Sequence, residues 1–407
     1  MVALPRRSVL NNTPLVQAFK QNAIAGILKY ITEVKEFCAA NAANVDFPNA
    51  FPEEEFKLIA ELGFLAAPLR RDLGGLGLGI ESACTGDLLM LLKQIGSGNL
   101  SVGRIYEGHV NALQLIQTFG TSEQIARYAA DAQDRHKIFG VWNAEAADGV
   151  KLVPIANGRY RLEGSKTFCS GCGYVDRPFV NGVLPDGSWQ MCIVPMEAVA
   201  TVIDSNWWQP SGMKATASYK VDFTGVELGE ESIIGQPGDY FRQPWLSAGV
   251  VRFAAVQLGG AEVLFNEARN FLQSLDRIQD PYQAERFSKM AIALETANLW
   301  LKNAAAFLTA YDSTFAGSPD VPHSQAKQLV VYANMTRTVV EQACMDVIQL
   351  CERSVGTRGL LPPNPMERII RDLTLYLRQP AYDIAFTSAG QYVLSHAESA
   401  SSLWDYE

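Results

Sequence analysis

The hydrophobic pattern of this chain changes its period twice, and these changes constrain the fold most. Up to about residue 135, apolar residues recur at steps of three and four, as in FKQNAIAGILKYITEVKEFCAANA, which is typical of amphipathic helices. From about Ile138 to 240, runs such as YRLEGSKTF, WQMCIVPM and YKVDFTGVEL alternate apolar and polar residues between Asn-Gly and Asp-Gly turns. From about Ala248 the helical period returns.

We therefore predict an α+β multidomain fold. It would have an N-terminal helical domain over residues 1–136, a central antiparallel β domain over 137–240 and a C-terminal helical domain over 241–407. The last part contains three long runs rich in Ala and Leu, which favour a four-helix-bundle-like arrangement. Thr121 is predicted to begin a helix, because its hydroxyl can accept hydrogen bonds from first-turn amides.

The composition is that of a globular protein, with 407 residues, 48% of them hydrophobic and 19% charged. A net charge of −9 argues against nucleic-acid binding, which needs a concentrated basic face. No uninterrupted apolar run reaches the roughly 18 residues of a membrane span, and the amino-terminal residues lack the apolar core of a signal peptide. Seven cysteines suit a reducing interior, so we expect a cytoplasmic protein.

Six segments, taken in order, resemble the acyl-CoA dehydrogenase family over nearly the whole chain. They are FGTSEQIARY, FGVWNAE, YRLEGSKTFCSG, GMKATASYKVDFTGVEL, VVRFAAVQLGG and VGTRG…NPMERIIRD, the last of which contains Arg368 and the pair Arg371-Asp372. Each match alone is weak, and together they are specific. The resemblance implies helical, β and helical domains in a homodimer or homotetramer, with FAD bound non-covalently between the β domain and the last helical domain; FMN is the less expected flavin.

The resemblance also assigns residues to the flavin ring. It aligns Trp142-Asn143-Ala144 with the family's first flavin strand, with Asn143 where that strand meets the ring. It places Phe168 over the ring and Ser170 near the ring atom N5. Trp142 and Phe168 are the aromatic residues that a flavin wall needs, although strands that merely pack an aromatic side chain have the same composition.

On the adenine side of the cofactor, the resemblance implies a glycine-rich turn. The family's Gln-x-x-Gly-Gly-x-Gly corresponds here to Arg353-Ser-Val-Gly356-Thr357-Arg358-Gly359. Glycines let the backbone approach a pyrophosphate, and an arginine adds positive charge. A second family segment, Arg-x-x-Phe-Gly-Lys, reaches the FAD of a neighbouring subunit. It begins here at Arg277 but continues as Ile-Gln-Asp-Pro, so the chain departs from the family there.

The chain also departs from the family at the catalytic base. In most members a glutamate follows the Arg-Asp pair by eight residues and abstracts the substrate α-proton; that position is Pro380 here. In others the glutamate precedes the arginine of the helix that matches VVRFAAVQ, and that position is Val251. Neither side chain can accept a proton. The next residue, Arg252, matches a position near the CoA-binding end of the site and is therefore a candidate for substrate binding.

Two carboxylates remain as candidate bases. Asp383 lies three residues beyond Pro380, where a solvated or helix-capping aspartate is the plainer interpretation. Glu107 lies in the helix that aligns with the acyl pocket of the family, so it is a candidate for both catalysis and substrate binding. A glutamate in an apolar pocket has a raised pKa and can act as acid or base, although a helix-surface glutamate is equally compatible with the sequence. His109 is turned about 200° from Glu107 around a helix, so we expect the two to face different surroundings.

Cys169 and Cys172 form a Cys-x-x-Cys pair with no second pair at a zinc-site spacing. A redox motif would need a strand–motif–helix context, whereas this segment is predicted to be strand and turn. We therefore expect no metal site, and a structural role for both cysteines.

Three functions are compatible with these patterns. The first is an FAD-dependent oxidoreductase acting on the CH–CH group of an acyl thioester or a similar small molecule. The second is a flavin-dependent monooxygenase or oxidase on the same fold, because some relatives use reduced flavin and O₂ without the catalytic glutamate. The third is a flavin-binding scaffold with little catalysis, because a fold does not fix a function.

Overall fold

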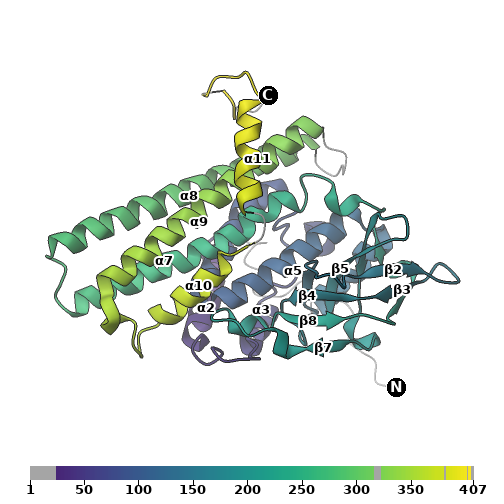
Figure 1. The fold of residues 1–407 in the computed structure, drawn as a ribbon, viewed down its shortest axis with the longest axis horizontal. Coiled ribbons are helices and arrows are strands. Elements are labelled where there is room, and N and C mark those ends of the chain that lie inside the picture. Colours follow the sequence, from purple (N-terminus) through teal and green to yellow (C-terminus); the bar gives the residue numbers. More distant parts are fainter. Residues whose placement is uncertain (1–23, 316–321, 380–381, 401, 405–407) are drawn as a thin grey trace.

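The computed structural model describes residues 24–315, 322–379, 382–400 and 402–404. Helices come first, then strands, then helices again, which confirms the predicted order (Figure 1). The amino-terminal segment in which no signal peptide was expected lies outside the described residues, and so does Pro380. The residue borders predicted for the three domains stay a prediction.

The first part consists of helices, and the connection over residues 62–84 is rich in glycine. Asn99 caps α5 by accepting hydrogen bonds from the amides of Ser101 (2.8 Å) and Val102 (3.4 Å). Thr121 begins α6, as predicted, and forms a reciprocal capping box with Gln124. The helices are α2 (Ile24–Asn41), α3 (Glu53–Glu61), α4 (Thr85–Gly98), α5 (Leu100–Phe119) and α6 (Ser122–Asp134).

The β part contains two sheets. One has seven strands, with the order β10-β6-β5-β2-β3-β9 and with β1 paired to β5; the other has the order β4-β8-β7. The strands are β1 (Phe139–Trp142), β2 (Lys151–Pro154), β3 (Tyr160–Glu163), β4 (Ser165–Cys169), β5 (Arg177–Val183), β6 (Trp189–Ile193), β7 (Val202–Asp204), β8 (Tyr219–Asp222), β9 (Glu227–Leu228) and β10 (Ile233–Ile234).

The larger sheet is mixed, so the expectation of a purely antiparallel domain needs one correction. β1 and β2 both run parallel to β5, whereas the other ladders are antiparallel. Alternation of apolar and polar residues reports only that a strand has two different faces. The direction of its neighbour depends on the connection between them, which the pattern does not specify.

The C-terminal helices are α7 (Val250–Ser274), α8 (Pro281–Phe315), α9 (His323–Gly359), α10 (Met366–Tyr376) and α11 (Tyr382–Leu394). Figure 1 shows α7, α8 and α9 side by side at the end away from the sheets, while α11 stands off the body. Apolar residues of α2, α4, α5 and α7–α10 form one buried cluster. The two helical parts therefore share a core.

Helices α4 and α7 meet backbone to backbone within that core. A Cβ at Gly96 would lie 2.3 Å from the carbonyl oxygen of Val256, and one at Gly259 would lie 2.0 Å from that of Lys93. Both distances are below any real contact, so only glycine permits this crossing. The approach anchors α7, whose first turn carries Val251 and Arg252.

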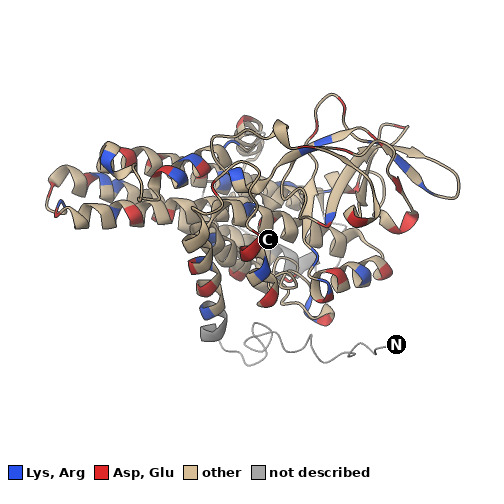
Figure 2. Cartoon of the chain, turned by 90° about the horizontal axis from the view of Figure 1, so that it is seen from below, with Lys and Arg blue, Asp and Glu red and all other residues tan. Residues whose placement is uncertain are grey.

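In the described part of the chain, the segment Ser247–Ser274 is long and apolar enough to cross a membrane, and 72% of its most apolar window is buried in the protein. A core helix of this kind passes the same test. All seven cysteines are buried and none forms a disulfide. Lys and Arg are interspersed with Asp and Glu over the helices and strands (Figure 2). The cytoplasmic location stays a prediction.

Candidate functional site

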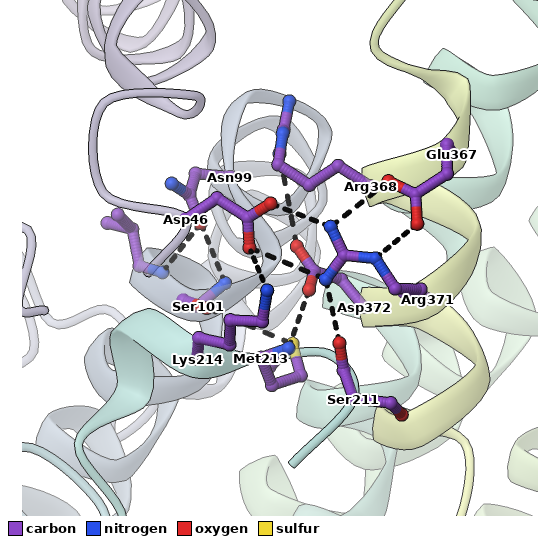
Figure 3. A network of polar contacts seen from close by, with 11 residues as sticks. Asp46, Asn99, Ser101, Ser211, Met213, Lys214, Glu367, Arg368, Arg371 and Asp372 are labelled. Carbon is purple, nitrogen blue, oxygen red and sulfur yellow. Dashed lines mark hydrogen bonds and ion pairs between the residues drawn. The ribbon is translucent and has the colours of Figure 1, made fainter. Parts of the chain in front are cut away.

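The Arg-Asp pair of α10 joins the three parts of the chain (Figure 3). Arg371 donates to Asp46 Oδ2 at 2.6 Å and to the carbonyl oxygen of Ser211 at 2.7 Å, so it links the first helices to the β part. Asp372 accepts the backbone N–H of Met213 at 2.5 Å. Its burial raises the pKa of this carboxyl to about 6. The pair therefore positions the loop that begins at Met213.

A chain of hydroxyl groups starts on that loop. Thr216 Oγ1 lies 2.8 Å from the carbonyl oxygen of Met213, which can only accept, so the hydroxyl of Thr216 must donate. Ser218 then donates to Thr216 at 2.8 Å, and Ser170 donates to Ser218 at 2.8 Å. Each hydroxyl has one proton, so Ser170 Oγ is left with lone pairs only. It can accept a hydrogen bond from a ligand N–H.

An exposed aromatic platform lies two residues from Ser170. Phe168 is 52% exposed and has a φ of 52°, which turns its ring outward where β4 changes register between Lys166 and Cys169. The rings of Trp207 and Trp208 lie roughly perpendicular to this ring, and their centroids are 4.7 Å and 6.0 Å from its centroid. A flat aromatic ligand fits such a platform, and the acceptor at Ser170 suits an N–H on its edge.

Trp142 and Asn143 lie behind this platform. The Trp142 indole is buried against Phe223 and donates to the carbonyl oxygen of Ser170 at 2.9 Å, so it supports the end of β4 from inside the sheet. Asn143 Oδ1 accepts from Asn181 Nδ2 at 2.8 Å. The structure thus brings Trp142 and Ser170 together, but it packs the Trp142 ring in the core.

On α5, Glu107 is buried and held in a polar cluster. Its carboxylate pairs with Arg104 Nη1 at 2.7 Å and also accepts from Asn111 Nδ2. His109 points away: its Nδ1 accepts the N–H of Phe139 at 3.0 Å, so its Nε2 must donate to the carbonyl oxygen of Leu65 at 2.8 Å. Burial lowers the pKa of His109 to about 4, so it is neutral. Both groups are thus committed to internal contacts.

A cavity lies beside the first turn of α7. Val251, one of the two family base positions, forms part of its wall together with Arg252, Gln114 and Trp245. Burial lowers the pKa of Arg252 to about 10, and the charge of Glu107 opposes that shift. Among the described residues that line the cavity, none is Asp, Glu or His. Asp383, the other candidate base, is exposed on α11.

The residues expected at the adenine end lie elsewhere. Arg353, Gly356 and Thr357 are exposed near the end of α9, whereas Gly359 is buried there against Val355. Arg277 is exposed after α7. Figure 1 shows both the end of α9 and the α7–α8 connection at the end of the bundle away from the sheets. A single chain therefore does not bring these residues to the Phe168 platform.

Arg277 is instead paired with Asp280 at 3.2 Å. The Cys-x-x-Cys pair is buried in the β part, and burial raises the pKa of both thiols, that of Cys172 to about 12. Within the described ranges, no group of three His, Cys, Asp or Glu side chains could hold a metal ion.

Sequence reasoning missed several residues of these sites. Trp207 and Trp208 are adjacent in the sequence but nearly 40 residues from Phe168, so no local pattern links them to it. Thr216 and Ser218 lie in a quoted family segment, GMKATASYKV, where their two-residue spacing was the available signal. Gln114 and Trp245 carry no local signal, because only the packing of α5 against the α7 region brings them to one cavity.

Comparison with known proteins places the chain among flavoenzymes. Models of the acyl-CoA dehydrogenase N-terminal and C-terminal domains match residues 30–134 and 251–377. A dibenzothiophene monooxygenase from Mycolicibacterium goodii is 24% identical over 373 residues, which cover 84% of this chain and 87% of that protein. The short-chain-specific acyl-CoA dehydrogenase of Clostridium acetobutylicum is 26% identical over 348 residues, with coverages of 81% and 86%. The FMN-bound structure of TdsC from Paenibacillus sp. A11-2 is similar with a TM-score of 0.81 at 21% identity, covering 93% of this chain and 99% of that one.

Proposed function

This chain belongs to the acyl-CoA dehydrogenase family, and we propose that within it the protein is a flavin-dependent monooxygenase. The observation that carries the proposal is the lack of a proton acceptor around the cavity beside α7. A CH–CH dehydrogenase must remove an α-proton, which requires a base within hydrogen-bond reach. The described lining offers Val251 at one family base position and no carboxylate or imidazole. Glu107 is already held by Arg104.

The similarity to dibenzothiophene monooxygenases supports the same conclusion. A bound reduced flavin would supply the electrons with which O₂ transfers one oxygen atom to a substrate while the other becomes water. This chain would hold the flavin ring against Phe168, with the Ser170 hydroxyl oxygen accepting an N–H of the reduced ring. The orientation of the hydroxyl chain from Met213 favours that acceptor role, because it leaves Ser170 no proton to donate.

We further propose that the flavin is FMN, in place of the FAD expected from the family. The similar TdsC structure is FMN-bound, and the segment after Arg277 lacks the family's adenine-side pattern. In the described chain Arg277 already has an acidic partner, Asp280. Chromatography of the flavin released by denaturing the purified protein tests this directly. FAD as the major product would contradict it.

We propose a homo-oligomer, either a dimer or a tetramer. Its support is the family to which the chain belongs, together with large apolar side chains that are exposed on two helices. They are Ile384, Phe386 and Leu394 on α11 and Tyr282, Ile292 and Leu299 on α8. Light scattering after size exclusion is expected to give a multiple of the 44.6 kDa chain mass, and Phe386→Ser to lower it. A monomeric wild-type protein would contradict this.

Two spectroscopic experiments test the monooxygenase proposal. The oxidised protein is titrated anaerobically with acyl-CoAs of several chain lengths, and we expect no bleaching of the flavin. The protein is then reduced by a separate flavin reductase with NADH and mixed with O₂ and either indole or dibenzothiophene. We expect the protein to consume oxygen and to hydroxylate indole or sulfoxidise dibenzothiophene. Bleaching by any acyl-CoA would support the dehydrogenase instead. A protein that binds neither FMN nor FAD would support the scaffold.

A further inference from the structure

Three buried polar atoms without a hydrogen-bond partner border the cavity beside α7. They are Arg252 Nε, Trp245 Nε1 and Gln114 Oε1. Arg252 is only 6% exposed, and its guanidinium makes no hydrogen bond or ion pair with any described residue. Most buried polar groups in native proteins are paired, so three exceptions around one cavity indicate a missing partner.

The charges around the cavity point to the sign of that partner. Glu107 carries one negative charge and is satisfied by Arg104 and Asn111. Arg252 therefore adds a positive charge that no described carboxylate contacts. A buried cation that lacks a contact partner is costly, and a bound anion removes that cost.

Apart from Thr85, the other side chains that line the cavity are apolar. Leu88 and Leu89 come from α4, Val251 from α7, Leu308 from α8 and Leu329 from α9. Gly249 leaves room for the guanidinium in this position, because a Cβ there would lie 2.4 Å from Arg252 Nη2. The cavity thus joins one polar corner to a wall that suits a hydrocarbon body.

We propose that this cavity binds a small organic carboxylate, with Arg252 as the specificity-determining residue. The guanidinium and the Trp245 indole N–H donate to the carboxylate oxygens, while the leucine-rich wall holds the apolar body. The inference rests on the proposed function only in treating this acid as the oxidised substrate. Binding itself requires no flavin chemistry.

Calorimetric titration of the purified protein, with its flavin oxidised and no reductase present, tests the proposal. The probe is benzoate, and nitrobenzene serves as its neutral isostere; octanoate and octanamide form a matched aliphatic pair. In at least one pair, the acid should bind about tenfold or more tightly than its neutral partner, which corresponds to about 1.4 kcal/mol or more and is expected for a charge-assisted contact. Arg252→Gln should abolish that preference and leave the affinity of the neutral compound unchanged.

Arg269→Gln is the matched control, because it makes the same substitution at an exposed position of the same helix. It should leave every affinity as in the wild type. If Arg252→Gln fails to fold, Trp245→Phe removes the second donor while the ring remains, and it should weaken acid binding alone. Equal affinities for acid and neutral partner in both pairs, or binding of neither acid, would overturn the proposal. Flavin reduction by an acyl-CoA would refute the monooxygenase proposal yet leave this binding result standing.

Discussion

The carboxyl of Asp372 should make the stability of this protein depend on pH in an unusual direction. Burial raises its pKa from the ordinary 3.8 to about 6, mainly because the side chain is only 5% exposed. Between these two values the folded state holds the proton that the unfolded state has lost. Stability therefore falls as pH rises from about 4 to 6, and the ionised carboxylate remains a cost at higher pH.

Replacing the group isolates its contribution. Asp372→Asn keeps a side-chain oxygen that can accept the N–H of Met213, but it cannot ionise. At 1.36 kcal/mol for each pH unit, the difference between 3.8 and about 6 corresponds to about 3 kcal/mol. The free energy of unfolding of the variant minus that of the wild type should therefore rise by about 2.4 kcal/mol between pH 4 and pH 7, since the rest of the change falls below pH 4.

Urea unfolding at half-unit pH steps measures this difference, and groups common to both proteins cancel in it. Asp134→Asn, the same substitution at an exposed position, corrects for the change in net charge. A difference between variant and wild type that stays constant across this range would refute the burial argument. So would a difference that falls with pH, which would mean that Arg368, 3.9 Å away, controls the carboxylate.

Three further predictions follow from the contacts around the site. Glu107→Gln should lower the free energy of unfolding in urea by about 1–3 kcal/mol, because Arg104 loses its buried counter-charge. It should leave oxygen-dependent turnover within about tenfold of the wild type, and a loss of several hundredfold in a folded variant would restore Glu107 as a catalytic residue. Ser170→Ala should weaken the binding of reduced flavin about tenfold in a fluorescence titration, because one hydrogen bond is lost. Ser188→Ala, at an exposed turn, should leave the affinity unchanged, and equal affinities for the wild type and Ser170→Ala would exclude the hydrogen bond between Ser170 and the flavin. Cys172 should resist a thiol reagent at pH 8 in the folded protein, because burial raises its pKa to about 12, and it should react on unfolding; rapid labelling of the native protein would contradict this.

The sequence by itself determined the types of element and their order. A period near 3.6 or 2 arises from how successive side chains are placed around one helix or one strand, so it is legible without tertiary information. The start of α6 at Thr121 is equally local, since its cap uses Gln124 three residues away. The family pattern around Arg371-Asp372 is also local, since the residues that define it are neighbours in the sequence.

The tertiary structure determined the roles of these residues. Asp372 accepts an amide 159 residues earlier in the chain, and Arg371 bonds to Asp46, 325 residues away, so their joining role could not be read locally. The direction of β1 and β2 relative to β5 likewise depends on chain connections. The unpartnered atoms of Gln114, Trp245 and Arg252 form one site only because α5 and the start of α7 pack together. Whether a polar side chain has a hydrogen-bond partner depends on residues that are distant in sequence. The chemistry of these sites therefore follows from the tertiary structure.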